Sequence, residues 1–292
     1  MRLLSLAFAA LLSALLMVGR GADAQSGSFG QFSTQIGGVT RTFWALVPPG
    51  LDPDEVRPVI FALHGGSGTA EAFLSKTGLV DRALSEGFVL IAPQGLDGHW
   101  RHADATSAAI TPAALRHAGD DLAFLAELGR LAVAQFRGDP ARFYGTGVSA
   151  GGMMLYRLAC QEPEGFQLRA IAVVASAMTI PETECPFARG TSLLHMHGDA
   201  DTRVPLNGGP GGGIFAGVVY PPAGNGSDFF WAANGCMPEK IFVPFSGVTE
   251  YRTGCPRQRQ VVFDHVRGGT HDWDLSSGFS ETGHVVAFLL SH

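Results

Sequence analysis

The chain has 292 residues, of which 16% are charged, and its formal net charge is −6. This length suits one α/β domain with a full hydrophobic core. Basic residues do not gather in a block along the sequence, so nucleic acid is not expected as a partner.

The N-terminal segment has the pattern of a signal peptide. A positive start at Met1-Arg2 precedes an apolar run over 3–18, and Ala22-Asp23-Ala24 matches a small-residue cleavage site. The alternative is a membrane anchor, but the run is short for a span of roughly 20 residues. We expect residues 1–24 to be removed and residues 25–292 to be secreted or periplasmic, without stable membrane insertion.

Residues 25–40 are rich in Gly, Ser and Gln and predict an exposed lead-in that could end in a hairpin. Beyond them, short apolar runs predict strands buried on both faces, and helical periodicity predicts helices. The expected strands cover 41–47, 59–63, 87–92, 142–145, 171–175, 192–196 and 261–265, and the expected helices cover 120–136, 151–160 and 282–290. The alternation predicts an α/β fold with a mostly parallel central sheet and helices on both faces.

A glycine-rich stretch over 207–227 interrupts this alternation. We interpret it as an irregular excursion within the same domain, because it separates two segments that the site described below needs together. Its glycines lack the G-K-[ST] of a phosphate-binding loop.

The stretch Gly147-Val148-Ser149-Ala150-Gly151 matches G-x-S-x-G between an expected strand and an expected helix. Such a turn is tight enough to need small neighbours, and it raises the serine hydroxyl above the sheet edge beside a helix N-terminus. Ser149 is therefore the predicted nucleophile. The overlapping residues 145–150 also fit G-x-G-x-x-A, but Ser176 stands where a ribose-binding acid is required, which disfavours nucleotide binding.

A serine nucleophile needs a base and an orienting acid, and in such folds the order along the chain is Ser, acid, His. Asp201 follows the expected strand 192–196 and is the predicted acid, with Asp199 as a rival that could instead cap a turn. His271 lies on a glycine-rich loop after the strand 261–265 and is the predicted base.

Small residues also follow the early buried strand, in His64-Gly65-Gly66. Backbone N–H groups can approach a substrate oxygen closely there, so we expect the N–H groups of Gly66 and Ala150 to form an oxyanion hole. The alternative is a plain glycine-rich loop. Trp100 and Trp273 follow strands near these segments, and each either walls a substrate-binding site or simply packs in the core.

Metals and cofactors are not expected. His195 and His197 could place two ligands on one strand face, but a third ligand is not evident, and the sequence holds no C-x-x-C. An even number of cysteines in an exported protein favours disulfides, with free thiols as the alternative. The spacing alone leaves three pairings open among Cys160, Cys185, Cys236 and Cys255.

From about residue 40 to its end, the sequence resembles the extracellular polyhydroxybutyrate depolymerase and feruloyl esterase group of α/β-hydrolases. The resemblance is carried by LHGG (63–66), IAPQG (91–95), DDLAFL (120–125), DPAR (139–142), GVSAGGMM (147–154), HGDAD (197–201) and GTHDW (269–273).

The resemblance implies a single catalytic domain over 25–292 with Ser149, Asp201 and His271 as its triad, in agreement with the reading of the residues. It also implies the bridges Cys160–Cys185 and Cys236–Cys255. The implied activity is that of a secreted serine esterase, which would cleave short hydroxyalkanoate or feruloyl-type esters, small or oligomeric, through an acyl-enzyme. The alternatives are a binding protein that keeps the fold without catalysis, and an acyltransferase or peptidase that uses the same triad.

Overall fold

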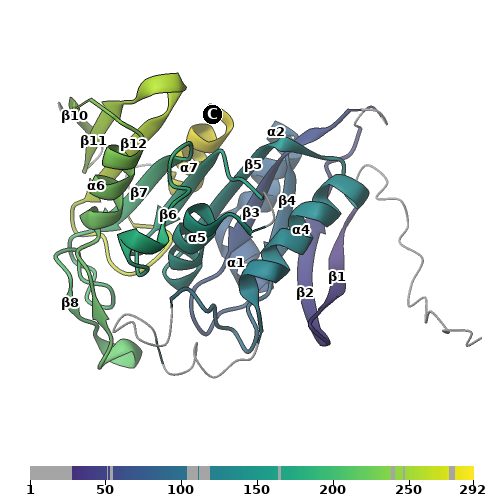
Figure 1. Ribbon diagram of the computed structural model, residues 1–292, viewed down its shortest axis with the longest axis horizontal. Coiled ribbons are helices and arrows are strands. Elements are labelled where there is room, and N and C mark those ends of the chain that lie inside the picture. Colours follow the sequence, from purple (N-terminus) through teal and green to yellow (C-terminus); the bar gives the residue numbers. More distant parts are fainter. Residues whose placement is uncertain are drawn as a thin grey trace, which may run out of the picture.

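The computed structural model describes residues 28–50, 52, 55–103, 111, 119–163, 166–237, 241–245, 247–275 and 280–292. The expected signal peptide, residues 1–24, lies outside the described residues and stays a prediction. In the described part, one long sheet runs through the middle of the molecule, with helices on both of its faces (Figure 1).

The sheet has ten strands in the order β1-β2-β4-β3-β5-β6-β7-β12-β11-β10. The strands from β4 to β12 in this order pair in parallel, and the strands outside them at both edges pair antiparallel. The predicted, mostly parallel sheet is therefore confirmed. The strands are β1 (Phe29–Ile36), β2 (Val39–Leu46), β3 (Arg57–Leu63), β4 (Val89–Pro93), β5 (Gly138–Val148), β6 (Ala170–Val174), β7 (Ser192–Gly198), β10 (Ile241–Phe245), β11 (Val248–Gly254) and β12 (Gln260–Val266).

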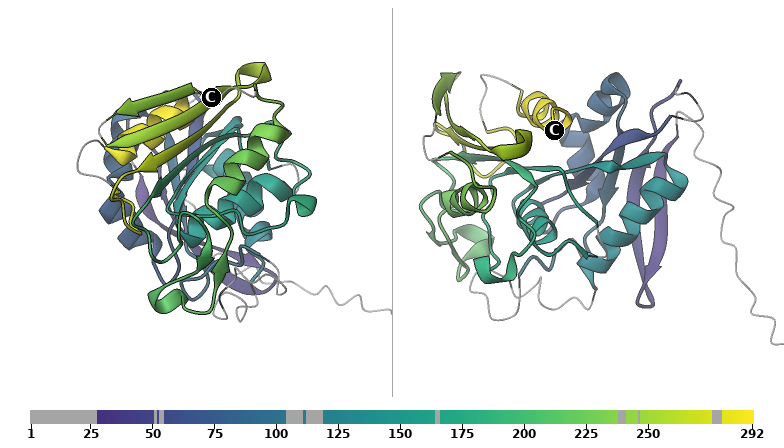
Figure 2. Two further views of the ribbon diagram at one scale, coloured as in Figure 1. Left: turned by 90° about the vertical axis from the view of Figure 1, so that its left-hand side faces the viewer. Right: turned by 45° about the horizontal axis from the view of Figure 1, so that its top comes forward.

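Two groups of helices cover the two faces of the sheet, as the views in Figures 1 and 2 agree. One face carries α4 (Asp121–Gln135), α5 (Ala150–Gln161) and α6 (Gly224–Ala233), and the other carries α1 (Ala70–Thr77), α2 (Leu79–Glu86) and α7 (Glu281–Leu290). Each face has its own hydrophobic core. None of the described helices has both the length and the apolar character that crossing a bilayer requires.

Strand β3 shows why the central strands are apolar without a break. Phe61 and Leu63 belong to the core beneath α4 and α5, whereas Ile60 and Ala62 point to the core beneath α1, α2 and α7. Successive side chains of a strand face opposite sides, so a strand covered on both sides buries every residue. Each fully buried large apolar side chain stabilises the fold by about 1.5–3 kcal/mol.

The expected elements are present, with boundaries that differ by a few residues, and β5 begins earlier than expected. The lead-in 25–40 includes β1, which forms a hairpin with β2. The stretch 207–227, expected to be an irregular excursion, also holds regular elements. This stretch contains the short pair β8 (Gly209–Pro210) and β9 (Val219–Tyr220), and α6 begins within it. Glycines give the start of α6 a low intrinsic helix propensity, and burial of Phe230 compensates by tertiary packing.

Both disulfides implied by the resemblance are present. Cys160 at the end of α5 is bonded to Cys185, and Cys236 after α6 is bonded to Cys255 after β11. Each bridge fastens a helix of the same face to a neighbouring loop.

Candidate active site

Ser149 stands between the end of β5 and the start of α5, with a backbone φ of 54°. Residues other than Gly rarely adopt a positive φ, so the surrounding structure must hold Ser149 in this conformation. A Cβ atom at Gly151 would collide with the carbonyl oxygens of Leu63 and His64, and a Cβ at Gly147 would crowd the same segment. The two glycines of G-x-S-x-G are therefore needed for close contact between this turn and the end of β3.

The three predicted site residues meet although they come from separate parts of the chain. The Nε2 atom of His271 lies 2.9 Å from Oγ of Ser149, and its Nδ1 atom lies 2.8 Å from Oδ2 of Asp201. In this arrangement the serine hydroxyl donates to Nε2 and the Nδ1–H donates to the carboxylate. Ser149 and Asp201 are 5% and 4% exposed, so their hydrogen bonds are shielded from water.

The carboxylate of Asp201 is held by more than His271. Its Oδ1 atom accepts the backbone N–H groups of Arg203 and Val204, each at 2.9 Å, and its Oδ2 atom lies 3.4 Å from Nε2 of His197. Burial by itself raises the pKa of Asp201, but hydrogen bonds from His197, His271 and the Val204 N–H outweigh burial and hold the pKa well below its usual value. Asp201 is therefore ionised at neutral pH.

The rival acid, Asp199, has different partners. Its Oδ1 atom accepts the N–H of Gly268 at 2.7 Å, and its Oδ2 atom lies 3.2 Å from Nε2 of His265. These contacts tie the segment after β7 to the beginning of the loop that carries His271. Asp199 thus supports this loop, whereas Asp201 contacts the imidazole of His271.

Behind Asp201 lies a buried series of hydrogen bonds that the sequence did not suggest. The hydroxyl of Tyr156 lies 2.9 Å from Nδ1 of His195, Nε2 of His195 lies 3.2 Å from Nδ1 of His197, and Nε2 of His197 lies 2.9 Å from the carbonyl oxygen of Val204. That carbonyl can only accept, so with a neutral His197 each hydrogen bond points from Tyr156 toward Val204 and Asp201. Burial keeps the pKa of His195 well below its usual value.

The two histidines alternate along β7, and residues two apart in a strand share a face. This spacing is the one local signal for the series, and it predicts two histidines on one strand face but not their hydrogen-bond partners. Tyr156 comes from α5, and nothing in the sequence pairs it with His195.

The expected oxyanion donors lie side by side. A Cβ atom at Gly66 would be 3.7 Å from Cβ of Ala150, which is the first residue of α5. The first N–H groups of a helix have no acceptor within it, so the N–H of Ala150 is available. The next two N–H groups of the glycine-rich loop are engaged, since Ser67 donates to Gly98 and Gly68 donates to Gly65.

His64 and Trp100 hold this loop in place. The indole N–H of Trp100 donates to the His64 carbonyl at 2.8 Å, and Nε2 of His64 accepts the N–H of Gly95 at 2.9 Å. Nδ1 of His64 lies 2.7 Å from the Gly65 carbonyl, so this nitrogen carries the proton. Burial lowers the pKa of His64 to about 4, which keeps the ring neutral near pH 7.

Two hollows meet at Ser149. One has a volume of about 170 Å³ and is walled mainly by large apolar or aromatic side chains, namely Trp100, Met153, Phe215 and Tyr220. The other has a volume of about 230 Å³ and includes His271 together with the polar side chains of Lys76, Arg203 and Asp272, beside Trp273.

Both expected tryptophans line these hollows, and both are also nearly completely buried, at 0% and 1% exposed for Trp100 and Trp273. The indole of Trp273 donates to the hydroxyl of Thr282 at 2.9 Å. Phe215, which the sequence did not single out, lines both hollows and packs edge-on against His271 at a ring-centroid distance of 5.9 Å. It belongs to the excursion that appeared irregular in the sequence.

The chain is similar to known esterases. It is 28% identical to feruloyl esterase C of Emericella nidulans over 251 residues, which cover 82% of this chain and 80% of that protein. It is 32% identical to NocK of Nocardia uniformis, described as an esterase, over 175 residues that cover 59% of this chain and only 48% of NocK. Acetyl xylan esterase from Aspergillus awamori has a similar structure, with a TM-score of 0.63 at 16% identity over 90% of this chain and 99% of that one. No protein-family model matches the chain.

The sheet topology and the structural similarity show that this chain has the α/β-hydrolase fold. The feruloyl esterase relatives support an esterase with this fold, as the motifs predict. The protein is a carboxylic ester hydrolase.

Proposed function

We propose that the chain is a secreted serine esterase that uses Ser149, His271 and Asp201 as a catalytic triad. The observation that carries this proposal is the unbroken line of hydrogen bonds from Oγ of Ser149 through both ring nitrogens of His271 to the carboxylate of Asp201. A buried carboxylate that stays ionised can hold the imidazole in one tautomer and stabilise the imidazolium that forms during reaction.

The reaction proceeds in two acyl-transfer steps. Nε2 of His271 accepts the hydroxyl proton while Oγ of Ser149 attacks the ester carbonyl carbon. The tetrahedral intermediate collapses as the bond to the alcohol oxygen breaks, and His271 returns the proton to that oxygen. Water, deprotonated by the same nitrogen, then attacks the acyl-enzyme and releases the carboxylic acid together with Ser149.

The N–H groups of Gly66 and Ala150 stabilise the negative oxygen of both intermediates. Loss of one such donor typically costs about 3 kcal/mol of transition-state stabilisation. The hydrogen bonds of His64 and Trp100 fix the Gly66 loop before substrate arrives, so little reorganisation is needed during reaction.

The two hollows suit the two halves of an ester. The departing alcohol takes its proton from His271 and must lie on that side, where Lys76, Arg203 and Asp272 offer polar contacts that fit a sugar hydroxyl. The acyl group then occupies the other hollow, where Trp100, Phe215 and Tyr220 form an aromatic wall. Aromatic acyl groups of the feruloyl type fit this wall best. Short hydroxyalkanoate esters are the alternative acyl class.

The proposal also covers the domain organisation and the location of the protein. Residues 1–24 are a cleaved signal peptide and residues 25–292 are one catalytic domain that acts outside the cytoplasm. The two disulfides agree with this location, because such bonds persist in oxidising compartments.

The first experiment compares hydrolysis of methyl ferulate, p-nitrophenyl acetate and p-nitrophenyl butyrate by the mature protein and by Ser149→Ala. The matched control is Ser85→Ala, which removes an exposed hydroxyl on α2. We expect Ser149→Ala to lose at least about 10⁴-fold in kcat, with Ser85→Ala unchanged. Activity that persists in folded Ser149→Ala would mean that the nucleophile is misassigned.

A second measurement separates the alternative activities. Product analysis with added alcohol or with peptides would reveal an acyltransferase or a peptidase. A folded wild-type protein that cleaves none of the esters would instead favour a binding protein.

A further inference from the structure

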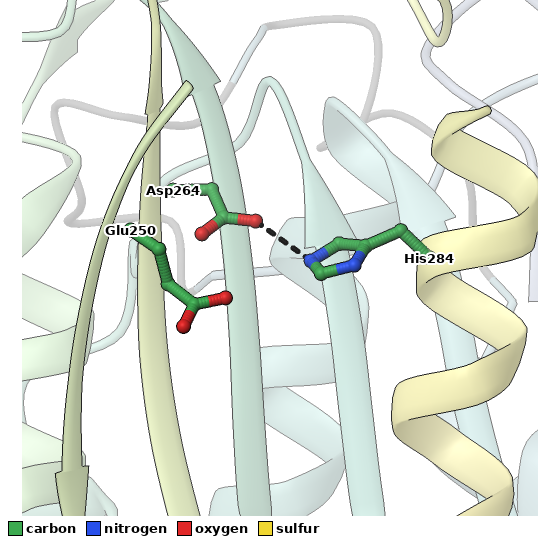
Figure 3. Close-up of side chains that lie close together, drawn as sticks. All are labelled: Glu250, Asp264 and His284. Carbon is green, nitrogen blue, oxygen red and sulfur yellow. Dashed lines mark hydrogen bonds and ion pairs between the residues drawn. The ribbon is translucent and has the colours of Figure 1, made fainter. Parts of the chain in front are cut away.

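Glu250, Asp264 and His284 form a cluster that the proposed reaction does not use (Figure 3). Glu250 in β11 and Asp264 in β12 are direct partners in the antiparallel pairing, so their side chains emerge on the same face of the sheet. Helix α7 covers this face and brings His284 over the pair, with Nε2 2.9 Å from Oδ2 of Asp264.

The negative charges of this cluster are poorly balanced. Asp264 is fully buried and Glu250 is 8% exposed, and like charges directly opposite each other on paired strands destabilise a sheet. Buried Glu281, in the first turn of α7, adds a third negative group that interacts with His284. Arg252 reaches Glu250 at 3.3 Å, but its side chain is 43% exposed, so solvent screens this ion pair in part.

A buried acceptor in the cluster also lacks a partner. Among the described residues, Oδ1 of Asp264 is shielded from solvent and receives no hydrogen bond. Leaving such an atom unsatisfied is costly, and more so for a charged group. Figure 3 shows the carboxylates of Glu250 and Asp264 near each other on neighbouring strands, with the imidazole of His284 facing them from α7.

The pKa values shift in the direction that excess negative charge requires. Burial raises the pKa of Asp264, and burial together with the charge of Asp264 raises that of Glu250. Burial lowers the pKa of His284, but the hydrogen bond and charge of Asp264 outweigh burial and raise it overall. The cluster thus attracts a positive charge, which either a proton or a metal cation can supply.

The geometry and chemistry of the donors suit a metal ion. One ligand atom from each residue lies within 4.8 Å of the other two. Zinc binds nitrogen and oxygen at about 2.0–2.2 Å, so donors around one tetrahedral ion lie roughly 3.4 Å apart, and small side-chain rotations close the difference. One imidazole with two carboxylates favours a first-row transition metal over Ca²⁺ or Mg²⁺, which prefer oxygen alone.

We propose that Glu250, Asp264 and His284 bind one divalent transition-metal ion, with Zn²⁺ as the probe. His284 releases its Nε2 proton to solvent and offers that nitrogen, and each carboxylate offers an oxygen. The side chain of His284 is 27% exposed, which leaves a way in for the ion and room for water as a further ligand. The bound ion fastens α7 to β11 and β12 and has no part in ester hydrolysis.

The test uses the mature protein after treatment with a chelator, titrated with Zn²⁺ by calorimetry at pH 8, with bound metal counted by mass spectrometry. We expect one ion per chain. At a hundredfold excess over Kd, Tm should rise by roughly 5–10 °C. His284→Gln and Asp264→Asn should each weaken binding by at least about 100-fold, the upper end of what losing a residue that merely supports a ligand costs.

His265→Gln is the matched control, because it disrupts another histidine–aspartate contact, between His265 and Asp199, and should bind Zn²⁺ as the wild type does. Equal binding by the wild type and His284→Gln, or no binding by the folded wild type, would overturn the proposal and leave the cluster balanced by protons alone. Circular dichroism checks folding of each variant. If Asp264→Asn does not fold, the partly exposed His284 still provides a decisive variant.

Discussion

Asp201 accepts hydrogen bonds from two backbone N–H groups and from His271, whereas Asp199 is bonded to Gly268 and lies near His265. These two aspartates are separated by one residue, and the sequence could rank them only by their distance from the strand. Their partners give each a different expected role, one in orienting the base and one in supporting a loop.

We predict that Asp201→Asn lowers kcat by about 10⁴-fold, because an amide can hold the imidazole of His271 in the wrong tautomer. Asp199→Asn should change kcat by less than about tenfold and act mainly on stability. Steady-state kinetics on a p-nitrophenyl ester measures both. A larger loss in Asp199→Asn than in Asp201→Asn would reverse the assignment.

A second prediction about a single residue concerns Tyr156. Tyr156→Phe leaves Nδ1 of fully buried His195 without its donor, so the free energy of unfolding should fall by about 1–3 kcal/mol. Because the series ends at Val204 and Asp201, kcat should also fall while KM stays the same. Urea unfolding and steady-state kinetics report the two effects. Unchanged stability would show that the hydrogen bond to His195 contributes nothing.

Helix α5 connects several of these features. Its N-terminus carries Ser149 and Ala150, its middle supplies Tyr156, and its last turn carries Cys160, which is bonded to Cys185. The bridge ties the far end of the helix to the segment that follows β6. Movement of this helix would displace the proposed nucleophile and the proposed oxyanion donor together.

The Cys160–Cys185 bridge closes a separation of 25 residues. In the chain-entropy model, closing a loop of that length stabilises the fold by roughly 3 kcal/mol. The double variant Cys160→Ala/Cys185→Ala should therefore unfold at a lower urea concentration, and reduction of the wild type should have at least as large an effect. A midpoint equal to that of the oxidised wild type would contradict the prediction.

Parts of the element order could be predicted because local patterns determine them. Strand β3 has an unbroken apolar run, and α4 has a broad apolar stripe. Strands β10 and β11 were missed because they lie at an antiparallel edge, where pairing with β12 depends on register rather than on a local run. The start of α6 was missed because its glycines oppose a helix that only tertiary packing stabilises.

The difference between local patterns and tertiary contacts also decides which site residues could be predicted. Ser149 and His271 could be predicted from a turn motif and from a loop after a strand. Phe215 and the cluster of Glu250, Asp264 and His284 could not, because their contacts join segments whose sequences carry no mutual signal. Glu250 and Asp264 lie opposite each other only because β11 pairs with β12, so they can be recognised as neighbours only when that register is known.

At the scale of the whole molecule, buried histidines link stability to pH. Burial lowers the pKa of His64 and of His102 from 6.5 to about 4. The unfolded chain therefore takes up protons between about pH 6.5 and pH 4 that the folded chain does not. Stability is greatest above this window and falls as the pH falls through it, by up to about 3 kcal/mol for each group.

His102→Gln tests this dependence. Urea unfolding of the wild type and the variant at pH 7 and pH 4.5 should show a smaller loss of stability in the variant, because the variant lacks the proton that His102 takes up on unfolding. Glutamine can keep a hydrogen bond to the hydroxyl of Thr179, which lies 2.9 Å from Nδ1 of His102. Equal losses in both proteins would show that His102 does not titrate as described.

The members of the proposed triad follow three different strands of one mostly parallel sheet, and Ser149 and His271 are 122 positions apart in the chain. A ribosome must therefore have synthesised the chain through residue 271 before the proposed base can reach the proposed nucleophile. If the triad is as proposed, a nascent chain that has not yet reached His271 carries Ser149 without its base and does not hydrolyse esters. On this assignment, ester hydrolysis can begin only after β12 has joined the sheet and His271 has reached Ser149.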